Sequence, residues 1–173
     1  MLEIERKFLI DVIPNDFTYF KAVKITQYYV PKSNIFIRFR KSEILEFFDT
    51  NIDLNNIIEK DYSIYITKYE QMIKSDGSKI RSEFTTAIDE NLFEFINTNS
   101  VDGKYYKIEK YRFYFYDENH IECTLDLYVD KNIKKIEVEF DSEFDCDNYT
   151  IPNWFGLEVT EDKKYSDYNI AIK

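Results

Sequence analysis

Apolar and polar residues alternate with a period of two in many parts of the chain, and this alternation is typical of a β-strand with one buried face. The segments that show it are residues 2–10, 23–30, 35–41, 62–69, 79–88, 105–116, 121–129 and 133–140. No βαβ rhythm connects them, so we expect the strands to pair in an antiparallel sheet. The pattern therefore predicts a mainly β fold of the α+β type with eight antiparallel strands.

Three short helices are expected to flank these strands, at residues 14–20, 89–97 and 166–172. The first has Pro14 near its first turn, the second has an acidic start, and the third has Ser166 as a candidate N-cap. Residues 43–61 are polar, acidic and poorly periodic, which predicts a long loop or an extended hairpin. A chain of 173 residues fits one domain, so we expect a single domain over 1–173 with an insertion at about 43–61.

Charge sign is sorted by strand on the polar faces. Arg38 and Arg40 share one face, Lys110 and Arg112 share another, and other strands carry only acidic pairs or mostly acidic residues. A solvated face usually mixes signs, although an ordinary half-buried sheet remains the alternative for any one strand. Arginine grips phosphate oxygens with a planar fork, and carboxylates hold Mg²⁺ and Mn²⁺. Together the faces predict a closed barrel whose charged lumen binds a polyanion with divalent metal.

Overall charge and composition argue against several classes of protein. Lys and Arg number 23 and Asp and Glu number 33, so the formal net charge is −10 and we expect no DNA partner. No apolar run is long enough for a membrane span, and the charged N-terminus does not resemble a signal peptide. Cys123 and Cys146 form no CxxC pair, and reduced thiols are expected. These features predict a cytoplasmic protein without a membrane partner.

An ordered series of short motifs runs from one end of the chain to the other. It starts with Glu3-x-Glu5-x-Lys7 and continues with Gln27-x-Tyr29, Arg38-x-Arg40, Thr67-Lys68, Arg81-x-Glu83, Lys110-x-Arg112, Asp126, Glu137-x-Glu139 and the run Trp154-Phe-Gly-Leu-Glu-Val-Thr160. This series resembles the CYTH family, also called triphosphate tunnel metalloenzymes, over essentially the whole chain. Two features depart from the family: Thr67 and Lys68 are adjacent where T-x-K is common, and residues 43–61 are longer than the usual connection.

The resemblance implies an eight-stranded antiparallel tunnel, a triphosphate-bearing substrate, and Mg²⁺ or Mn²⁺ as cofactor. By motif, the residues that would bind the phosphates are Lys7, Arg38, Arg40, Lys68, Arg81, Lys110 and Arg112. Those that would hold metal are Glu3, Glu5, Asp126, Glu137 and Glu139, and those placed at the chemical step are Glu5, Lys7, Glu137 and Glu139. Glu158 and Lys164 of the C-terminal motif would close one mouth of the tunnel.

The activity that this resemblance favours is hydrolysis of inorganic triphosphate or a related triphosphate by a monomer or homodimer. A class IV adenylate cyclase is an alternative, although the His-Phe pair that such cyclases often carry before Glu-x-Glu-x-Lys is not present. Thiamine triphosphatase is a further alternative. A non-catalytic polyphosphate- or nucleotide-binding module is disfavoured by the full set of carboxylates, because a pure anion binder gains nothing from acids near its ligand.

Overall fold

The computed structural model describes residues 2–31, 36–49, 53–57, 59–74, 80–100 and 105–172. All eight strands expected from the sequence are present in it. Their bounds are β1 Leu2–Leu9, β2 Lys21–Tyr29, β3 Phe36–Phe47, β4 Tyr62–Lys74, β5 Ile80–Ala87, β6 Tyr106–Tyr116, β7 Glu122–Tyr128 and β8 Lys134–Glu139. The expected mainly β, antiparallel fold is therefore confirmed.

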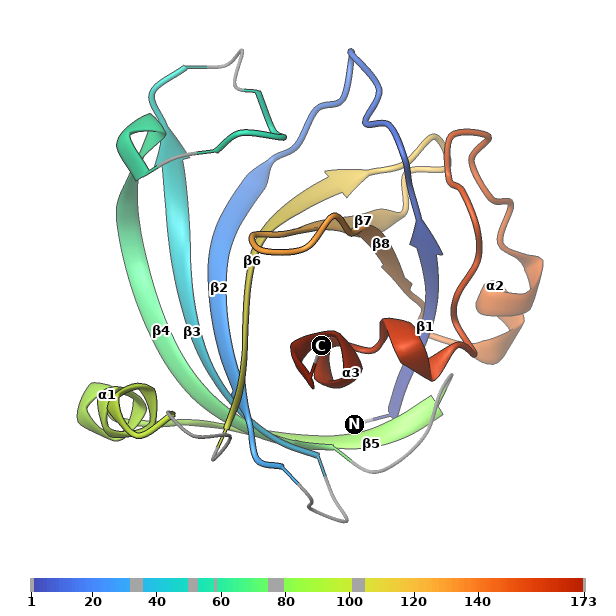
Figure 1. The fold of residues 1–173 in the computed structure, drawn as a ribbon. Coiled ribbons are helices and arrows are strands. Elements are labelled where there is room, and N and C mark those ends of the chain that lie inside the picture. The colour runs from blue at the N-terminus through green and yellow to red at the C-terminus, as the bar shows by residue number, and fades with distance from the viewer. Residues whose placement is uncertain are drawn as a thin grey trace.

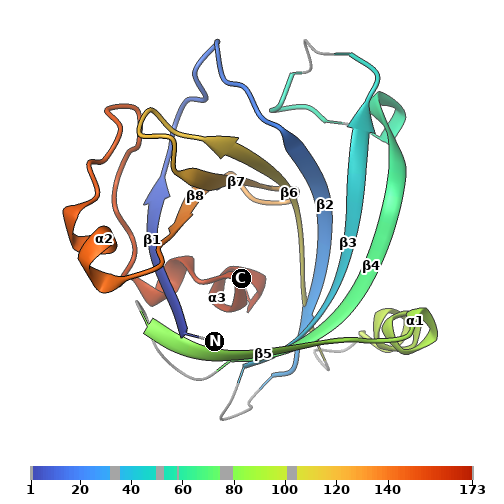
Figure 2. The same cartoon turned by 180° about the vertical axis from the view of Figure 1, so that it is seen from behind.

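The strands form a closed barrel in the order β1-β5-β4-β3-β2-β6-β7-β8, and all their pairings are antiparallel. The two ends of this order meet at β1, which pairs with β5 through residues 2–4 and with β8 through residues 5–9. Figures 1 and 2 show the strands around a central space that contains the C-terminal helix α3, Asp167–Ile172. The lumen is therefore shared between strand side chains and one helix.

Apolar side chains lie on the outside of one half of the barrel rather than inside it. Phe8, Phe113, Leu125 and Ile136 are fully buried there, and they belong to one cluster on the outer faces of β1, β6, β7 and β8. The segments before β2 and after β8 cover this cluster with further aromatic side chains. Charged residues one position along each strand consequently point into the lumen, because successive strand side chains alternate between faces.

The C-terminal motif covers the edge of β1 that β5 leaves free. The N–H of Leu9 donates to the carbonyl of Leu157 at 2.8 Å, and the N–H of Val159 donates to the carbonyl of Lys7 at 2.8 Å. Gly156 lies against the same edge, where an added Cβ would come within 2.4 Å of the Leu9 carbonyl oxygen. Glycine at this position thus permits the close approach of two backbones.

Two of the three expected helices are present, and each has the start that the sequence predicted. Helix α1, Glu90–Thr98, is capped by Asp89, and α3 follows Ser166, whose hydroxyl accepts from the N–H of Asn169 at 3.3 Å. Helix α2, Glu143–Asn148, and the 3-10 turns η1, Glu59–Asp61, and η2, Lys163–Tyr165, were not expected. Helix α2 has a good N-cap in Ser142 but too short a sequence for apolar periodicity.

The prediction of a helix at residues 14–20 is wrong. The segment is irregular with a turn at residues 15–16, and its aromatic residues pack on the outer apolar cluster. The ring centroid of Phe17 lies 5.1 Å from that of Phe115, and the centroid of Tyr19 lies 4.9 Å from that of Phe113. Alternate side chains of an extended segment reach the sheet in this way, so tertiary packing overrides the local helix signal.

Residues 43–61 combine strand and connection. Strand β3 continues to Phe47 and pairs with the start of β4, with a register shift between Ile44 and Leu45. The extended-hairpin alternative thus holds for residues 43–47, and η1 lies at the other end of the segment, directly before β4. Over the described parts of the chain, the structure has no helix that is both long and apolar enough to cross a membrane.

A substitution of Phe8 tests whether the outer apolar cluster holds the barrel together. Phe8→Ala should lower the free energy of unfolding by about 3–5 kcal/mol, because it deletes a fully buried ring and leaves a cavity. Urea denaturation followed by circular dichroism measures this change. Phe144→Ala is the control, since Phe144 is 74% exposed on α2 and its loss should change stability by less than about 0.5 kcal/mol.

Candidate active site

The barrel encloses a cavity of about 180 Å³ whose lining is strongly charged. The residues singled out from the sequence that line it are Glu5, Lys7, Arg38, Arg40, Arg112, Glu137 and Glu139. Glu83 from β5 and residues of the C-terminal segment complete the lining. The structure therefore brings together side chains that are far apart in the sequence; Glu5 and Glu139, for example, are separated by 134 positions.

Five residues of the expected site are not among the described residues that line this cavity. Lys110 and Asp126 are fully buried directly behind it, and both bond to residues that line it. Lys68 pairs with Ser42 in the β3–β4 ladder, and its side chain is exposed. The side chain of Arg81 lies outside the described residues, as does that of Glu3, the fifth expected residue missing from the lining.

The arginines of β3 lie in the lumen with incomplete neutralisation. Arg38 is 7% exposed, its Nε has no hydrogen-bond partner within the described structure, and its Nη2 donates to the thioether of Met72 at 2.6 Å. A thioether is a weak acceptor for a guanidinium. Burial, with the positive charges of Arg38 and Arg112, lowers the pKa of Arg40 to about 10. Arg40 still carries its charge at neutral pH, and its described ion pair is with Glu70 at 3.4 Å. Two guanidinium groups thus share one described carboxylate, so this part of the lumen is electropositive.

Arg112 is held rigidly on the opposite side of the cavity by two carboxylates. Its Nε and Nη2 donate to Asp126 at 2.7 Å each, and Nη2 also donates to Glu137 at 2.5 Å. Lys110 Nζ donates to the same Asp126 at 2.5 Å. Asp126 is fully buried, and its bidentate contact with Arg112 fixes the direction of the Arg112 fork.

Two further lumen residues extend this network to the C-terminal helix. Lys135 Nζ lies 2.9 Å from Glu137 and 2.6 Å from Asp167 of α3. Burial alone would raise the pKa of Glu137, but Lys135 and Arg112 lower it well below its ordinary value. Burial likewise opposes ionisation of Asp167, and Lys110 and Lys135 lower its pKa well below the usual range. Both carboxylates are therefore ionised at neutral pH.

Acidic residues gather where β1 pairs with β8. Glu5 lies directly opposite Glu139, and Lys7 lies directly opposite Glu137. Lys7 Nζ also donates to Glu5 at 2.6 Å. Like charges directly opposite each other on neighbouring strands are destabilising, which favours a cation between Glu5 and Glu139. Glu5 and Glu139 would offer carboxylate oxygens to this cation, and these are the ligands that hard divalent cations prefer.

A second group of carboxylates could also share a cation. Oxygens of Asp126, Glu137 and Asp167 all lie within 4.8 Å of one another. Each of these carboxylates already accepts from lysine or arginine in this structure. The carboxylates fit Mg²⁺ or Mn²⁺ in chemistry, but the three of them are balanced by Lys110, Arg112 and Lys135. Glu5 and Glu139 lie directly opposite each other with one described lysine partner, Lys7, and are the better candidates for a metal centre.

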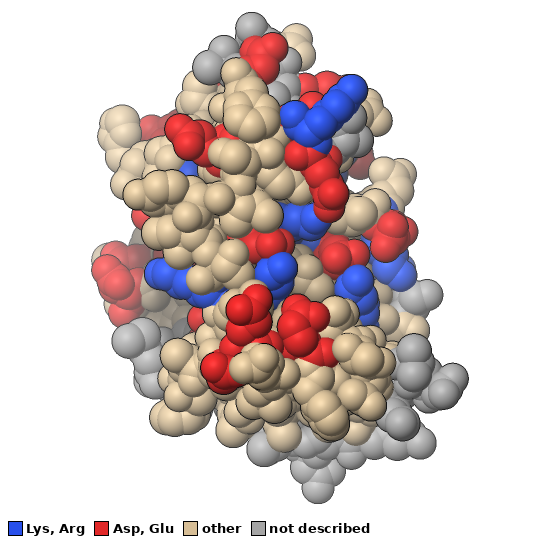
Figure 3. All heavy atoms as spheres, turned by 90° about the vertical axis from the view of Figure 1, so that its left-hand side faces the viewer, with Lys and Arg blue, Asp and Glu red and all other residues tan. Residues whose placement is uncertain are grey.

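A second cavity lies on the outer face of the barrel, and its charges can be compared with those of the lumen. It measures about 450 Å³ and is lined by residues of β2, β3, β4, β6, η1 and α1. Its lysines pair with glutamates: Lys24 with Glu59 at 3.1 Å and Lys41 with Glu43 at 2.8 Å. Figure 3, which faces this side of the barrel, shows acidic and basic side chains interspersed. Because these charges neutralise each other, the lumen is the stronger site for a polyanion.

Two residues of the site were missed by sequence reasoning. Lys135 shares the strand face of Glu137 and Glu139, and this parity was the available signal. Asp167 lies on a helix, where strand alternation gives no information. The expectation for Glu158 is wrong: it forms a two-point contact with Arg6, at 2.9 and 2.6 Å, on the outer face of β1.

Comparisons with known proteins agree with this geometry. No family model matches the sequence. A protein of Nitrosomonas europaea named inorganic triphosphatase is 30% identical over 176 residues, which covers 99% of this chain and 98% of that protein.

Among solved structures, the crystal structure of an inorganic triphosphatase matches with a TM-score of 0.64 and 28% identity, over 99% of this chain and 95% of that one. A putative adenylyl cyclase from Hippeastrum, described as having a dominant triphosphatase activity, matches with a TM-score of 0.52 and 13% identity, over 84% of this chain and 82% of that one. This second likeness concerns the fold alone. The chain therefore belongs to the same family as the inorganic triphosphatase of Nitrosomonas europaea.

Proposed function

We propose that this protein is a metal-dependent hydrolase of inorganic triphosphate, of the CYTH or triphosphate tunnel type. The observation that carries the proposal is the buried, incompletely neutralised arginine pair of β3. Arg38 donates to a thioether and has an unpartnered Nε, and the two arginines share one described carboxylate, Glu70, which lies 3.4 Å from Arg40. Burial, with the charges of Arg38 and Arg112, lowers the pKa of Arg40 to about 10. Triphosphate oxygens would supply the missing acceptors and charge, because guanidinium groups bind phosphate in a fork.

Basic residues from several strands of the barrel would bind the phosphate groups. Arg38, Arg40 and Arg112 would bind phosphate oxygens, and Lys7 would do so from β1. Lys110 would act from behind the cavity, since it is fully buried and holds Asp126. Lys68 is exposed and takes no part in the proposal. Arg81 and Glu3 keep the predicted roles that their motifs imply.

Glu5, Glu137 and Glu139 would hold Mg²⁺ or Mn²⁺, with Asp126 behind them. A bound divalent ion of this kind offsets charge on phosphate oxygens and assists the attack of water on phosphorus. Glu137 is ionised at neutral pH because of Lys135 and Arg112, so it would serve as a ligand or acceptor and not as a proton donor. The fixed arginines would stabilise charge on the transferred phosphoryl group, and no covalent step is required.

An inorganic substrate fits the aromatic residues of the cavity better than an organic one. The ring of Tyr168 lies 5.2 Å from Phe36, 5.6 Å from Tyr29 and 6.0 Å from Tyr106, measured between centroids. These rings pack around α3, so they are already engaged and do not offer a free stacking surface for adenine or thiamine. The proposal therefore favours triphosphatase over the cyclase and thiamine triphosphatase alternatives.

A phosphate-release assay on inorganic triphosphate, ATP and thiamine triphosphate tests the activity. Wild-type protein should release phosphate fastest from inorganic triphosphate with Mg²⁺ or Mn²⁺, and chelator should abolish release. Arg38→Met should lower kcat/KM by at least about 100-fold, because it removes a charged group from the phosphate site. Lys41→Met, on the opposite face of the same strand, is the control and should stay near wild type. Cyclic AMP from ATP, or full activity of Arg38→Met, would contradict the proposal.

Glu5→Gln tests the metal assignment separately. The amide keeps the shape of the side chain but removes the charge opposite Glu139, so kcat should fall by at least about 100-fold, with half-saturation at higher metal concentration. Circular dichroism should show an intact barrel. Glu109→Gln, on the outer face of β6, should leave the metal titration unchanged. A Glu5→Gln enzyme with the wild-type metal titration would mean that Glu5 is not a ligand.

A further inference from the structure

The carboxylate of Asp167 lies in a pocket of four donors that the barrel supplies. Its Oδ1 accepts from Tyr128 Oη at 2.6 Å and from Lys135 Nζ at 2.6 Å. Its Oδ2 accepts from Lys110 Nζ at 2.7 Å and from Gln27 Nε2 at 3.2 Å. Each donor comes from a different strand, namely β7, β8, β6 and β2. The barrel thus builds an anion pocket, and helix α3 supplies the anion.

The donors of this pocket have partners on the barrel wall besides Asp167. Lys110, Lys135 and Gln27 are 0% exposed, and Tyr128 is 4% exposed. Lys110 is also fixed by Asp126, and Lys135 by Glu137. Both ammonium groups lie 5.4 Å from the centre of the Tyr128 ring. Contacts within the barrel wall therefore help to orient both lysines toward the pocket.

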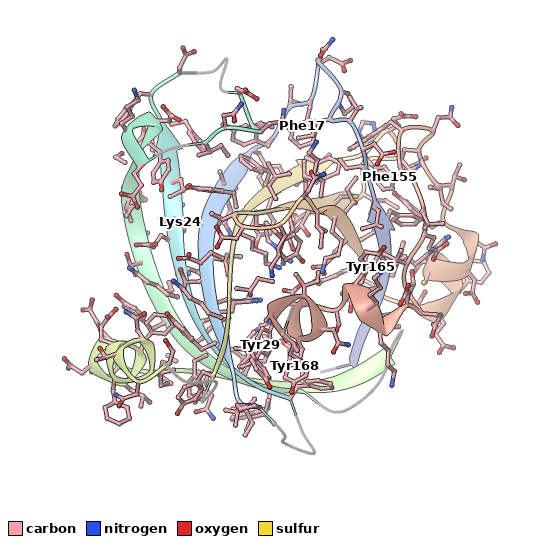
Figure 4. All side chains as sticks on the ribbon, viewed as in Figure 1. Phe17, Lys24, Tyr29, Phe155, Tyr165 and Tyr168 are labelled. Atoms are coloured by element: carbon pink, nitrogen blue, oxygen red, sulfur yellow. The ribbon has the colours of Figure 1, made fainter. Side chains whose placement is uncertain are left out.

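Apolar packing keeps α3 in the lumen. Ile170 is 1% exposed and belongs to one cluster with Tyr29, Ile108 and Tyr128. Figure 4 shows Tyr168 beside Tyr29 at the end of the barrel where α3 docks, and their ring centroids are 5.6 Å apart. Asp167 is consequently presented to the pocket by a packed helix. A tethered group of this kind competes with free ligand at high effective concentration.

Charge counting shows what Asp167 does to the lumen. The buried network contains three cations and three carboxylates, so it is neutral with Asp167 and carries one positive charge without it. The members are Lys110, Arg112, Lys135, Asp126, Glu137 and Asp167. On the β3 side, by contrast, Arg38 and Arg40 share one described carboxylate, Glu70, so a net positive charge remains there.

We infer that Asp167 is a specificity-determining residue that limits the length of the polyphosphate the lumen accepts. Its carboxylate fills the pocket of Gln27, Lys110, Tyr128 and Lys135 where a further phosphate group would otherwise bind. This inference rests on the proposed function, since it takes the lumen as a triphosphate site. A triphosphate uses the arginine side, and a fourth phosphate group meets the carboxylate and is repelled.

Binding measured with chelator present separates this inference from catalysis. Inorganic triphosphate and tetraphosphate are titrated by calorimetry into wild type, Asp167→Asn and Asp162→Asn. Asp162 is the control, because it caps η2 of the same C-terminal segment and does not line the lumen. Wild type and Asp162→Asn should prefer triphosphate. Asp167→Asn should shift the tetraphosphate-to-triphosphate affinity ratio by about tenfold toward tetraphosphate, because it adds one net positive charge to the pocket.

A double variant and a stability measurement exclude a merely structural effect. Lys135→Gln added to Asp167→Asn replaces an ammonium by a neutral amide, so it removes the added net positive charge and should return the ratio toward wild type. Asp167→Asn alone should melt at a lower temperature without anion, and tetraphosphate should stabilise it more than it stabilises wild type. A lower melting temperature with an unchanged ratio would overturn the inference and leave Asp167 as a structural anchor of α3. Failure of wild type both to bind triphosphate here and to release phosphate from it with Mg²⁺ or Mn²⁺ would overturn the proposed function as well.

Discussion

Burial of ionised side chains inside the barrel is the constraint on which the rest of the structure depends. Removing a charge from water costs several kcal/mol unless other groups compensate it. On the β6–β8 wall the compensation is complete, since Asp126, Glu137 and Asp167 match Lys110, Arg112 and Lys135. On the β3 wall it is not, because Arg38 has an unpartnered Nε and a thioether contact in the described structure. The molecule thus keeps one part of its lumen ready for an anion and the other part neutral.

A charged interior requires the apolar core to lie elsewhere, and the order of elements follows from this. The outer cluster of Phe8, Phe113, Leu125 and Ile136 needs a cover, which the segments before β2 and after β8 provide. The last of these segments then runs along the free edge of β1 through Gly156 and Val159 and leads the chain to α3. One path therefore both protects a strand edge and delivers Asp167 to the lumen.

Strand alternation was sufficient to predict the eight strands and the faces that meet in the lumen, because both follow from a strict period of two. It identified Arg38, Arg40 and Arg112 through their sorted charge, and the structure brings these residues to one cavity. Three-dimensional packing decided the rest. Residues 14–20 have helix signals but cover the sheet in irregular form.

Residues whose role depends on a neighbour in space could not be identified from the chain alone. Asp167 lies on a six-residue helix, and the sequence around it does not indicate that it contacts Lys110 and Lys135. Lys68 is the lysine of its motif and has the same parity along β4 as residues that face the lumen, yet its side chain is exposed. Glu158 was predicted to close a tunnel mouth, but it binds Arg6, whose side chain lies on the outer face of β1.

The central claim is that the lumen is the triphosphate site, and a crystal structure with a non-hydrolysable triphosphate analogue and Mg²⁺ tests it most directly. We expect phosphate density in the cavity, in contact with Arg38, Arg40 and Arg112, with the metal bound to Glu5 or Glu139. Phosphate density in the outer cavity beside Lys24 and Lys41, with the lumen unchanged, would contradict it.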